Sequence, residues 1–377
     1  MQSTSILINY VYWPAFGHGI EALRYAYGYH LANPEKRISI LLNKYTPVSV
    51  AELCPWIDRI YTVGIASDKA FVSSKLYSGI PTQWDYIISD PRGDSTDKYS
   101  APGAFGRHFT YIRKNFIPNK GRGVMGDSTL PYKPNSHLYI TLPAISVEKA
   151  LDRLLDTQIK IAVLLTGGSY PRSFWPSLES WSKILTKLAD QHTNVSFYFI
   201  GKSAKKGVQT PTHLAKKELQ TLLERFSQSV NCFDIDLLEQ LAIVKACDLL
   251  ISPHSGFGFA ASMVKTPWLI ISGGNWPEYF FNGTPFYSVL PDPGAYPCYD
   301  DAFSKPVRDD DGTKRIPSMR HQRILDDAEE IVAASQSLIN GDRSYNQALG
   351  DHFSKMKRFY SGSQRIQWFD NTHERFV

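Results

Sequence analysis

The first 42 residues alternate between continuous apolar runs and helical spacing of apolar side chains. Residues 5–12 and 37–42 form near-continuous apolar runs, which are typical of strands buried on both faces. Between them, residues 13–19 contain a proline and two glycines and predict a turn, and residues 20–33 space their apolar side chains as a helix does. Strand, helix and strand in this order predict a right-handed βαβ unit in a parallel sheet.

The same alternation continues through the rest of the first half. Strands are predicted at residues 57–63, 84–89 and 137–142, and helices at 105–116 and 147–155. Residues 119–135 are rich in Gly, Pro and Lys and predict a loop. The helix at 147–155 would close a first domain, so a boundary is predicted near residue 156.

A second series of strands and helices starts at residue 160. Strands are predicted at 160–166, 195–201, 248–252 and 268–272, and helices from Pro176 onward, at 214–226, 237–247, 322–338 and 346–360. Residues 275–320 predict loops. The chain is therefore predicted to be an α/β protein with two Rossmann-like domains, 1–156 and 157–345, followed by a helical segment, 346–377, that packs back toward the first domain. Ligands of open α/β sheets bind beyond the carboxyl ends of the strands, so we expect the two domains to face a ligand-binding cleft.

The turn after the strand at 248–252 carries a candidate phosphate site. Ser255 is a natural helix N-cap, and Gly256 and Gly258 allow a ligand to approach the backbone. A helix that begins there directs free N–H groups and the positive end of its dipole toward an anion. The alternative interpretation is that the glycines serve only the packing of helix on strand, and the sequence leaves both open.

Composition narrows the class of protein. The chain has 377 residues and a net charge of +5, which fits anionic small molecules and is too weak to indicate nucleic acid. Its four cysteines are scattered without a C-x-x-C pair, so we expect reduced thiols and no zinc site. No signal peptide is predicted, and no apolar run approaches the ~20 residues that span a bilayer. We therefore expect a cytoplasmic protein, with any membrane contact peripheral and on the inner face.

Four segments together resemble those of GT-B glycosyltransferases, most closely the heptosyltransferase-like family (glycosyltransferase family 9). The segment from Ser255 through Ala261 to Thr266-Pro267 resembles the donor-binding loop of that family. The segment from Gly167-Gly168-Ser169 to Trp175-Pro176 is similar to its "G-A-S … W-P" stretch. Residues 16–23 stand where the family has a Gly-Asp turn, and residues 55–60 resemble a recurrent "p-x-i-D-x-v" segment.

The chain also departs from the family pattern. His18 and His254 stand where the family carries Asp, Phe259 where it has His, and Ser173 where it often has Lys. The acceptor and donor can therefore differ from those of heptose transfer, and a non-catalytic member is an open alternative.

The resemblance implies inverting transfer of a sugar from a nucleotide-sugar donor, without a metal or another cofactor. On the donor side it points to eight residues: Ser169, Arg172, Lys202, His254, Ser255, Gly256, Phe257 and Gly258. Backbone N–H groups with Arg172 and Lys202 would stabilise the charge of the leaving nucleoside diphosphate. The alternative for Lys202 is a solvated loop lysine, and for His254 a packed structural histidine.

An inverting transfer needs a base for the proton of the acceptor hydroxyl. His18 is the first candidate, because imidazole ordinarily has a pKa of about 6.5, and Glu21 is the second. Gly17, Asp90 and Arg92 are candidate acceptor contacts. The alternative for His18 is a structural histidine at the start of the helix, bonded to the backbone. For Asp90 and Arg92 the alternative is an ordinary solvated turn, and this interpretation is favoured.

These observations predict a hexosyl- or heptosyl-type transferase of carbohydrate biosynthesis. Its acceptor would be a glycan, a lipid-linked saccharide or a small molecule, and nucleic acid is not an expected partner. The sequence leaves two competing functions: a nucleotide-sugar epimerase or hydrolase of the same fold, and a nucleotide-sugar-binding protein with a degenerate site. A dinucleotide oxidoreductase is disfavoured, since the first strand is not followed by G-x-G-x-x-G.

Overall fold

The computed structural model describes residues 5–11, 15–64, 73–90, 103–125, 129–166, 171–203, 212, 216–274, 282–298 and 305–357. The chain divides into two compact units, of which the first runs to Ile140 and the second begins at Thr141. Helix α4 (Ala144–Leu151) belongs to the second unit because it packs on α7 (Leu237–Ala246). Nε of Arg153, just after α4, donates to Oε1 of Glu239 on α7 at 2.5 Å. The division therefore falls earlier in the chain than the sequence predicts.

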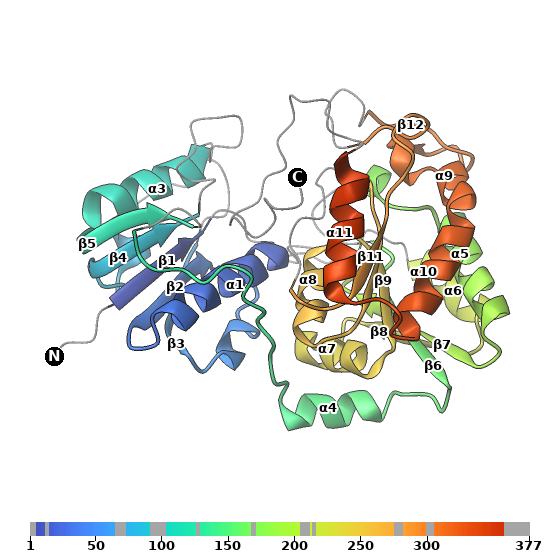
Figure 1. Ribbon diagram of the computed structural model, residues 1–377, viewed down its shortest axis with the longest axis horizontal. Coiled ribbons are helices and arrows are strands. Elements are labelled where there is room, and N and C mark those ends of the chain that lie inside the picture. The colour runs from blue at the N-terminus through green and yellow to red at the C-terminus, as the bar shows by residue number, and fades with distance from the viewer. Residues whose placement is uncertain are drawn as a thin grey trace. The chain divides into compact units, whose positions relative to one another are not determined.

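The first unit is a parallel five-stranded sheet with a helix on each face (Figure 1). The strands, in sheet order, are β3 (Ile57–Val63), β2 (Arg37–Asn43), β1 (Ser5–Tyr10), β4 (Gln83–Ser89) and β5 (Ile117–Val124). The helices are α1 (Phe16–Ala32) and α3 (Gly103–Asn115), with short 3-10 turns η1 (Ala51–Leu53) and η2 (Ser74–Tyr77). Leu7 and Ile87 from the sheet pack with Phe109 and Ile112 of α3, so α3 covers one face. Helix α1 packs on β1 and β2.

Two predictions for the first unit are wrong. Strand β5 occupies part of the predicted loop at 119–135, because an edge strand pairs on one side only and tolerates residues such as Pro118 and Lys120. Residues 137–142 are not a strand. The preceding segment instead runs along α1: the N–H of Lys133 donates to the carbonyl of Gly28 at 3.1 Å, and Nδ2 of Asn33 donates to the carbonyl of Pro131 at 2.8 Å.

The second unit is a parallel six-stranded sheet. Its strands, in sheet order, are β11 (Phe286–Val289), β10 (Trp268–Ile271), β9 (Leu249–Pro253), β6 (Ile159–Val163), β7 (Val195–Gly201) and β8 (Ser229–Phe233). Its other elements are α5 (Leu178–Gln191), α6 (Lys216–Arg225), α8 (Gly256–Met263), α9 (His321–Asp326), α10 (Ala328–Ile339), α11 (Tyr345–Met356), the 3-10 turns η3 (Arg172–Phe174) and η4 (Pro317–Met319), and the short hairpin β12 (Val307–Arg308) with β13 (Lys314–Arg315). Strands β11, β12 and β13 fall in the stretch predicted as loop.

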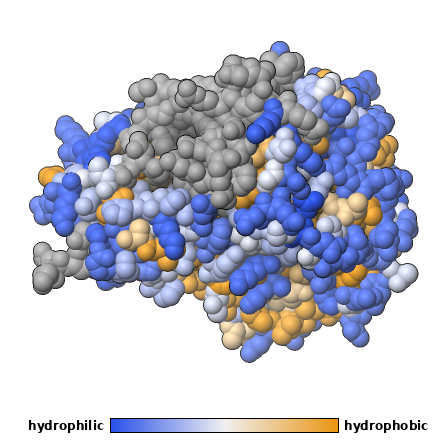
Figure 2. Space-filling view, viewed as in Figure 1, coloured by the Kyte–Doolittle hydropathy of each residue, from blue (hydrophilic) through white to orange (hydrophobic). Residues whose placement is uncertain are grey.

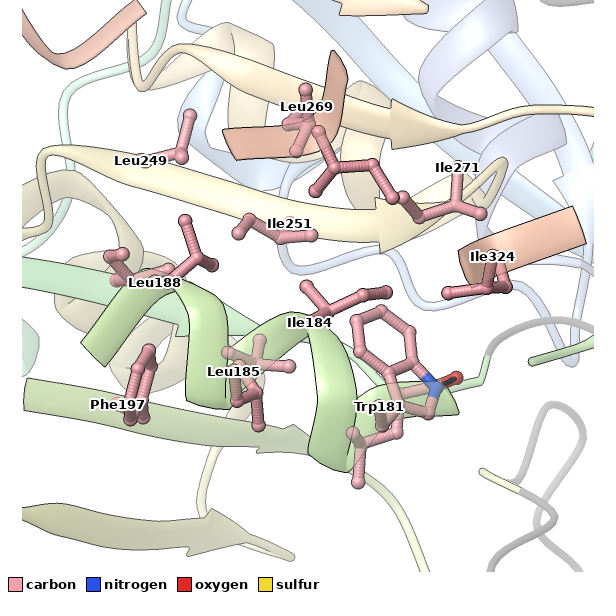
Figure 3. Close-up of a cluster of buried hydrophobic side chains, with 14 of the residues drawn as sticks. Trp181, Ile184, Leu185, Leu188, Phe197, Leu249, Ile251, Leu269, Ile271 and Ile324 are labelled. Atoms are coloured by element: carbon pink, nitrogen blue, oxygen red, sulfur yellow. Dashed lines mark hydrogen bonds between the residues drawn. The ribbon is translucent and has the colours of Figure 1, made fainter. Parts of the chain in front are cut away.

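The core of this unit lies between the sheet and helices α5, α6, α9 and α10. Figure 3 shows part of this core, with side chains of α5 beside those of the sheet. Trp181, Ile184 and Leu188 of α5 follow helical spacing and meet Phe197 of β7 and Ile251 of β9. The indole nitrogen of Trp181 donates to the carbonyl of Leu165 at 2.9 Å, so even this large side chain keeps its polar atom paired. The opposite face of the sheet carries α7 and α8.

Helix α4 presents its large apolar side chains outward. Ser146 and Ala150 are its buried residues, and small side chains allow α4 to approach α7 closely. Ile145 and Leu151 are 58% and 56% exposed, and Figure 2 shows apolar surface over α4. Glu148 and Lys149 are exposed as well, so the outer face of this helix mixes apolar and charged side chains, whereas an ordinary surface helix exposes a polar face.

The described part of the C-terminal segment packs on the second unit, and the expected return of this segment toward the first domain stays a prediction. Helix α11 contacts β11, and the ring of Phe286 on that strand lies 6.2 Å from Tyr345 and 5.9 Å from His352. Residues 358–377 lie outside the described residues. The predicted helix at 322–338 is divided into α9 and α10 at Asp327.

Candidate functional site

The turn between β9 and α8 has the predicted helix cap. Ser255 has extended backbone angles, φ −154° and ψ 153°, and its Oγ accepts the N–H of Gly258 at 3.1 Å. The first N–H groups of a helix have no intrahelical partner, so those of Gly256 and Phe257 remain at the opening. Strand β9 is central in the sheet, and α8 begins at its carboxyl end. This is the place and polarity that a phosphate requires.

Gly258 is needed because of Trp268 on the neighbouring strand β10. A Cβ at position 258 would lie 2.5 Å from both Cε2 and Cη2 of the indole, a separation that real structures do not tolerate. The indole is fixed in turn, since its Nε1 donates to Oγ of Ser252 at 2.8 Å. Gly258 therefore serves tight packing, which is one of the two interpretations that the sequence left open, and that packing holds the start of α8 against the sheet.

His254 and Phe259 extend this cluster. The two rings meet edge to face with centroids 5.2 Å apart, and Phe259 lies edge-on to Trp268 at 5.8 Å. His254 is partly exposed, so it is neither a fully packed histidine nor a solvated one. Phe259, which like His254 departs from the family pattern, connects His254 to the buried Trp268.

The β6–α5 connection carries Arg172, and Ser169 lies outside the described residues. Arg172 is exposed at 45% of its side chain and pairs with Glu218 in the first turn of α6. The carbonyl of Ser173 accepts the N–H of Ile316 at 3.0 Å, so the hairpin β12–β13 supports this connection. Arg172 therefore stands beside the first turn of α6 with its charge already matched by a carboxylate.

The connection also rests on a buried ion pair in the hairpin. Arg315 is 1% exposed, and its Nη1 lies 3.0 Å from Oδ2 of Asp309, which is fully buried, and 2.8 Å from Oδ1 of Asp311. Nε of Arg315 donates to the carbonyl of Trp175 at 3.2 Å. The guanidinium thus ties the hairpin to the residue that follows η3.

Lys202 follows β7 at the same edge of the sheet. Its side chain is exposed, while its backbone pairs with Thr212: the N–H of Thr212 donates to the carbonyl of Lys202 at 2.7 Å. Gln240 of α7 fixes the preceding residue, because its Oε1 accepts the N–H of Gly201 at 3.0 Å. Lys202 is therefore a solvent-facing lysine on a well-anchored strand end.

In the first unit, His18 and Glu21 form a pair on one face of α1. The helix begins at Phe16, earlier than predicted, so Gly17 and His18 lie in its first turn. Nδ1 of His18 is 3.3 Å from Oε2 of Glu21, and their side chains are 24% and 7% exposed. Burial raises the pKa of Glu21, against the lowering effects of His18 and Arg24. A partly accessible imidazole backed by a buried carboxyl is the arrangement that holds a base in one orientation.

Asp90 lies at the same edge of this sheet and is fully buried. It follows β4, and its N–H donates to the carbonyl of Asn9 on β1 at 3.0 Å. The favoured interpretation of an ordinary solvated turn is therefore wrong for Asp90, because pairing with the central strand β1 places the residue inside. Arg92 lies outside the described residues.

Two residues that bear on these sites are not among the candidates that the sequence predicts. Trp268 lies in an apolar strand, and nothing local in the sequence marks its contact with Gly258. Asn9 is fully buried in β1, and its Nδ2 donates to Oγ of Ser89 at 3.2 Å. For Asn9 the available signal is a polar residue near the carboxyl end of an otherwise apolar strand.

Comparison with known proteins identifies the fold. No family model matches the chain, and no curated protein matches it. Among solved structures, a glycosyl transferase of family 9 from Veillonella parvula is similar with a TM-score of 0.62 and 15% identity, over 90% of this chain and 98% of that one.

Two Escherichia coli enzymes are similar at lower scores. ADP-heptose LPS heptosyltransferase II gives a TM-score of 0.52 and 11% identity over 88% of this chain and 99% of that one. Heptosyltransferase WaaC with ADP-2-deoxy-2-fluoro heptose gives a TM-score of 0.51 and 11% identity over 87% of this chain and 99% of that one. The chain thus has the GT-B fold of heptosyltransferase-like proteins, and the predicted fold class is confirmed.

Membrane spans and metal clusters are both absent from the part of the chain that the structure describes. No described helix combines the length and apolar composition needed to cross a membrane. Within the same residues, no three His, Cys, Asp or Glu side chains are grouped so that they could hold a metal ion.

Proposed function

We propose that this protein is a glycosyltransferase that moves a sugar from a nucleotide-sugar donor to an acceptor hydroxyl. The observation that carries the proposal is the start of α8, where the Ser255 cap and the Gly258–Trp268 contact fix N–H groups at the carboxyl end of a central strand. Its support is the GT-B fold, which aligns over 90% of this chain with a family 9 glycosyl transferase and over 88% with a heptosyltransferase. One of these enzymes is an ADP-heptose heptosyltransferase and another was solved with an ADP-sugar, which makes a nucleotide-sugar donor the natural choice.

In this proposal the second unit holds the donor. The N–H groups of Gly256 and Phe257 receive the diphosphate and stabilise the negative charge that develops as the glycosidic bond breaks. The guanidinium of Arg172 leaves Glu218 and binds a phosphate of the donor. Lys202, at the end of β7, adds a second positive charge. His254 and Ser169, the latter outside the described residues, are the remaining proposed donor contacts.

The first unit supplies the acceptor side. With Nδ1 of His18 directed at Glu21, Nε2 is the nitrogen that takes the proton of the acceptor hydroxyl as that oxygen attacks the anomeric carbon. Direct attack by the acceptor inverts the configuration at that carbon. Glu21 acts through His18 by orienting the imidazole, and Gly17, Asp90 and Arg92 are the proposed acceptor contacts.

The leaving-group charge is met here by backbone N–H groups and Arg172, so we propose transfer without a metal or cofactor. The acceptor class is a glycan, a lipid-linked saccharide or a small molecule, and the pathway class is carbohydrate biosynthesis. A cytoplasmic location, with peripheral contact at the inner face of the membrane, belongs to the same proposal.

A thermal-shift screen tests the donor site. UDP, GDP, ADP, CMP and dTDP, alone and as sugars, are added to the wild type, Gly258→Ala and Gly350→Ala. Nucleotides with one particular base should raise the melting temperature, since a ligand at about 100 times its dissociation constant adds about 2.7 kcal/mol to the free energy of unfolding. Gly350 is the matched control, because a Cβ built there meets nothing within 4 Å apart from the neighbouring backbone of its own helix. No shift with any nucleotide, or an equal shift in Gly258→Ala, would contradict the proposal.

A further inference from the structure

A cavity lies in the second unit, at the edge of the sheet opposite the proposed donor site. It has a volume of about 440 Å³ and is bounded by the amino-terminal ends of β6 and β9 and by the carboxyl-terminal ends of α5 and α10. The start of α8 lies at the carboxyl end of β9, so the length of that strand separates the two places. This cavity therefore plays no part in holding the donor.

His192 is the buried polar group of this cavity. It follows α5, is 9% exposed and lines the cavity, and its Nε2 has no hydrogen-bond partner among the described residues. Its backbone is committed, since its N–H donates to the carbonyl of Leu188 at 3.1 Å. Burial lowers the pKa of His192, so the imidazole is neutral near pH 7. A buried, neutral ring nitrogen at a cavity wall is a hydrogen-bonding group with an unmet requirement.

The rest of the lining offers amides rather than cations. Gln191 and Asn194 flank His192, and Gln336 and Asn340 come from the end of α10. Nε2 of Gln336 donates to Oδ1 of Asn340 at 2.6 Å, which orients this amide pair. Side-chain amides present donors and acceptors together, as a ligand with many hydroxyl groups requires.

Charge disfavours anionic ligands. None of the described side chains that line the cavity is a lysine or an arginine, and one, Asp248, is a carboxylate whose Oδ2 accepts the N–H of Lys160 at 2.8 Å. The carboxyl ends of two helices add partial negative charge. Phosphates and nucleotides therefore find no counter-charge here. Ile159 and Ile339 provide the apolar surface on which the C–H face of a sugar ring rests.

We propose that this cavity, lined by His192 and the surrounding amides, is a second site that binds a neutral saccharide unit. It would hold part of a glycan at a place remote from the reacting atoms. This inference does not rest on the glycosyltransferase activity, because it concerns a different edge of the sheet and a ligand without phosphate.

The test is saturation-transfer NMR on the full chain with neutral methyl glycosides of glucose, galactose and N-acetylglucosamine. We expect saturable binding in the millimolar range to at least one of them, weakened about fivefold in His192→Leu by the loss of one hydrogen bond. His30→Leu, the same change at a partly buried histidine of the first unit, should leave binding unchanged, and so should Gly258→Ala.

If His192→Leu does not fold, the pair Asn194→Ala and Gln336→Ala replaces it at the rim of the cavity. The proposal is overturned if no glycoside binds saturably, if binding is unchanged in the cavity variants, or if ethylammonium binds there and the glycosides do not. Loss of nucleotide binding in Gly258→Ala with retained glycoside binding separates this site from the proposed donor site.

Discussion

The indole of Trp268 occupies the space that any side chain at position 258 would need. A Cβ built on Gly258 would approach the indole to 2.5 Å at two ring atoms, and the indole cannot swing away without losing its hydrogen bond to Ser252. The first turn of α8 is thereby held against β10. Because this turn begins at the carboxyl end of β9, packing in the core fixes the position of the exposed N–H groups.

Gly258→Ala should destabilise the protein by about 1–3 kcal/mol, the usual result of overpacking a filled site. Urea denaturation followed by circular dichroism measures this change. Gly350→Ala provides the control: its Cβ meets open space within α11, and alanine in a helix interior should stabilise by about 0.5–1 kcal/mol. Equal stability of the two variants would show that Trp268 yields and that the contact does not fix the turn.

Ser255→Ala should cost about 1 kcal/mol of stability through loss of the cap and should also weaken nucleotide binding, because the cap shapes the opening of α8. Ser344 is the matched control, since it caps α11 through the same bond, with its Oγ accepting the N–H of Gln347 at 3.3 Å. Ser344→Ala should lose similar stability and keep nucleotide affinity. A parallel loss of affinity in both variants would mean that stability alone, and not the turn, governs binding.

His18→Ala should lower kcat about 10²–10⁴-fold, the usual contribution of a general base, with little change in the affinity for the nucleotide. The assay follows release of nucleoside diphosphate in the presence of acceptor. His30→Ala, in the same helix but three turns further on, serves as the control and should retain activity. Retained activity of His18→Ala would assign the base to another residue.

Glu21→Gln should stabilise the protein most at neutral and alkaline pH. Burial raises the pKa of Glu21 above its ordinary value of 4.5, so the folded state favours the protonated carboxyl. Its stabilising contribution is present below pH 4.5 and is lost as pH rises through the raised pKa. The melting temperature of the variant should therefore exceed that of the wild type at pH 7.5, and the gap should close toward pH 4. A gap that is constant with pH would show that Glu21 does not titrate with a raised pKa.

Arg315→Met should destabilise by about 3–5 kcal/mol, because it removes the guanidinium 3.0 Å from the buried carboxylate of Asp309 and leaves that carboxylate with Nε of Arg320 at 3.7 Å and the N–H of His321. The double variant Arg315→Met with Asp309→Leu should recover much of this loss, since both charges are then removed. Denaturation of the single and double variants measures the coupling. If the double variant is no more stable than the single one, the hairpin depends on the wider network with Asp311 and Trp175 rather than on the pair.

Local patterns in the sequence predicted those parts of the site that local chemistry determines. The Ser255 cap follows from the order of Ser, Gly and apolar residues, and the structure has it. The burial of Asp90 could not be predicted, because it depends on pairing with β1, some eighty positions earlier in the chain. The packing of residues 131–136 along α1 is likewise a long-range contact, in which Nε of Arg24 donates to the carbonyl of Ser136 at 3.2 Å.

The same limit explains the errors in the fold. Strand β5 carries few strand-forming residues and is held by its single neighbour β4, so its composition predicts a loop. Helix α4 is predicted correctly as a helix, but its membership in the second unit depends on α7, to which Arg153 is bound through Glu239. The pairing of β5 and the packing of α4 therefore both depend on contacts with elements far away in the sequence.

The most direct test of the proposed donor site is a calorimetric titration of nucleoside diphosphates into the wild-type protein and Gly258→Ala. We predict one binding site, selective for one base, with affinity reduced about tenfold or more in Gly258→Ala, equivalent to at least about 1.4 kcal/mol, and unchanged in Gly350→Ala. If no nucleotide binds the wild type, or if Gly258→Ala binds it equally well, the start of α8 is not a donor site and the proposed transfer loses its basis.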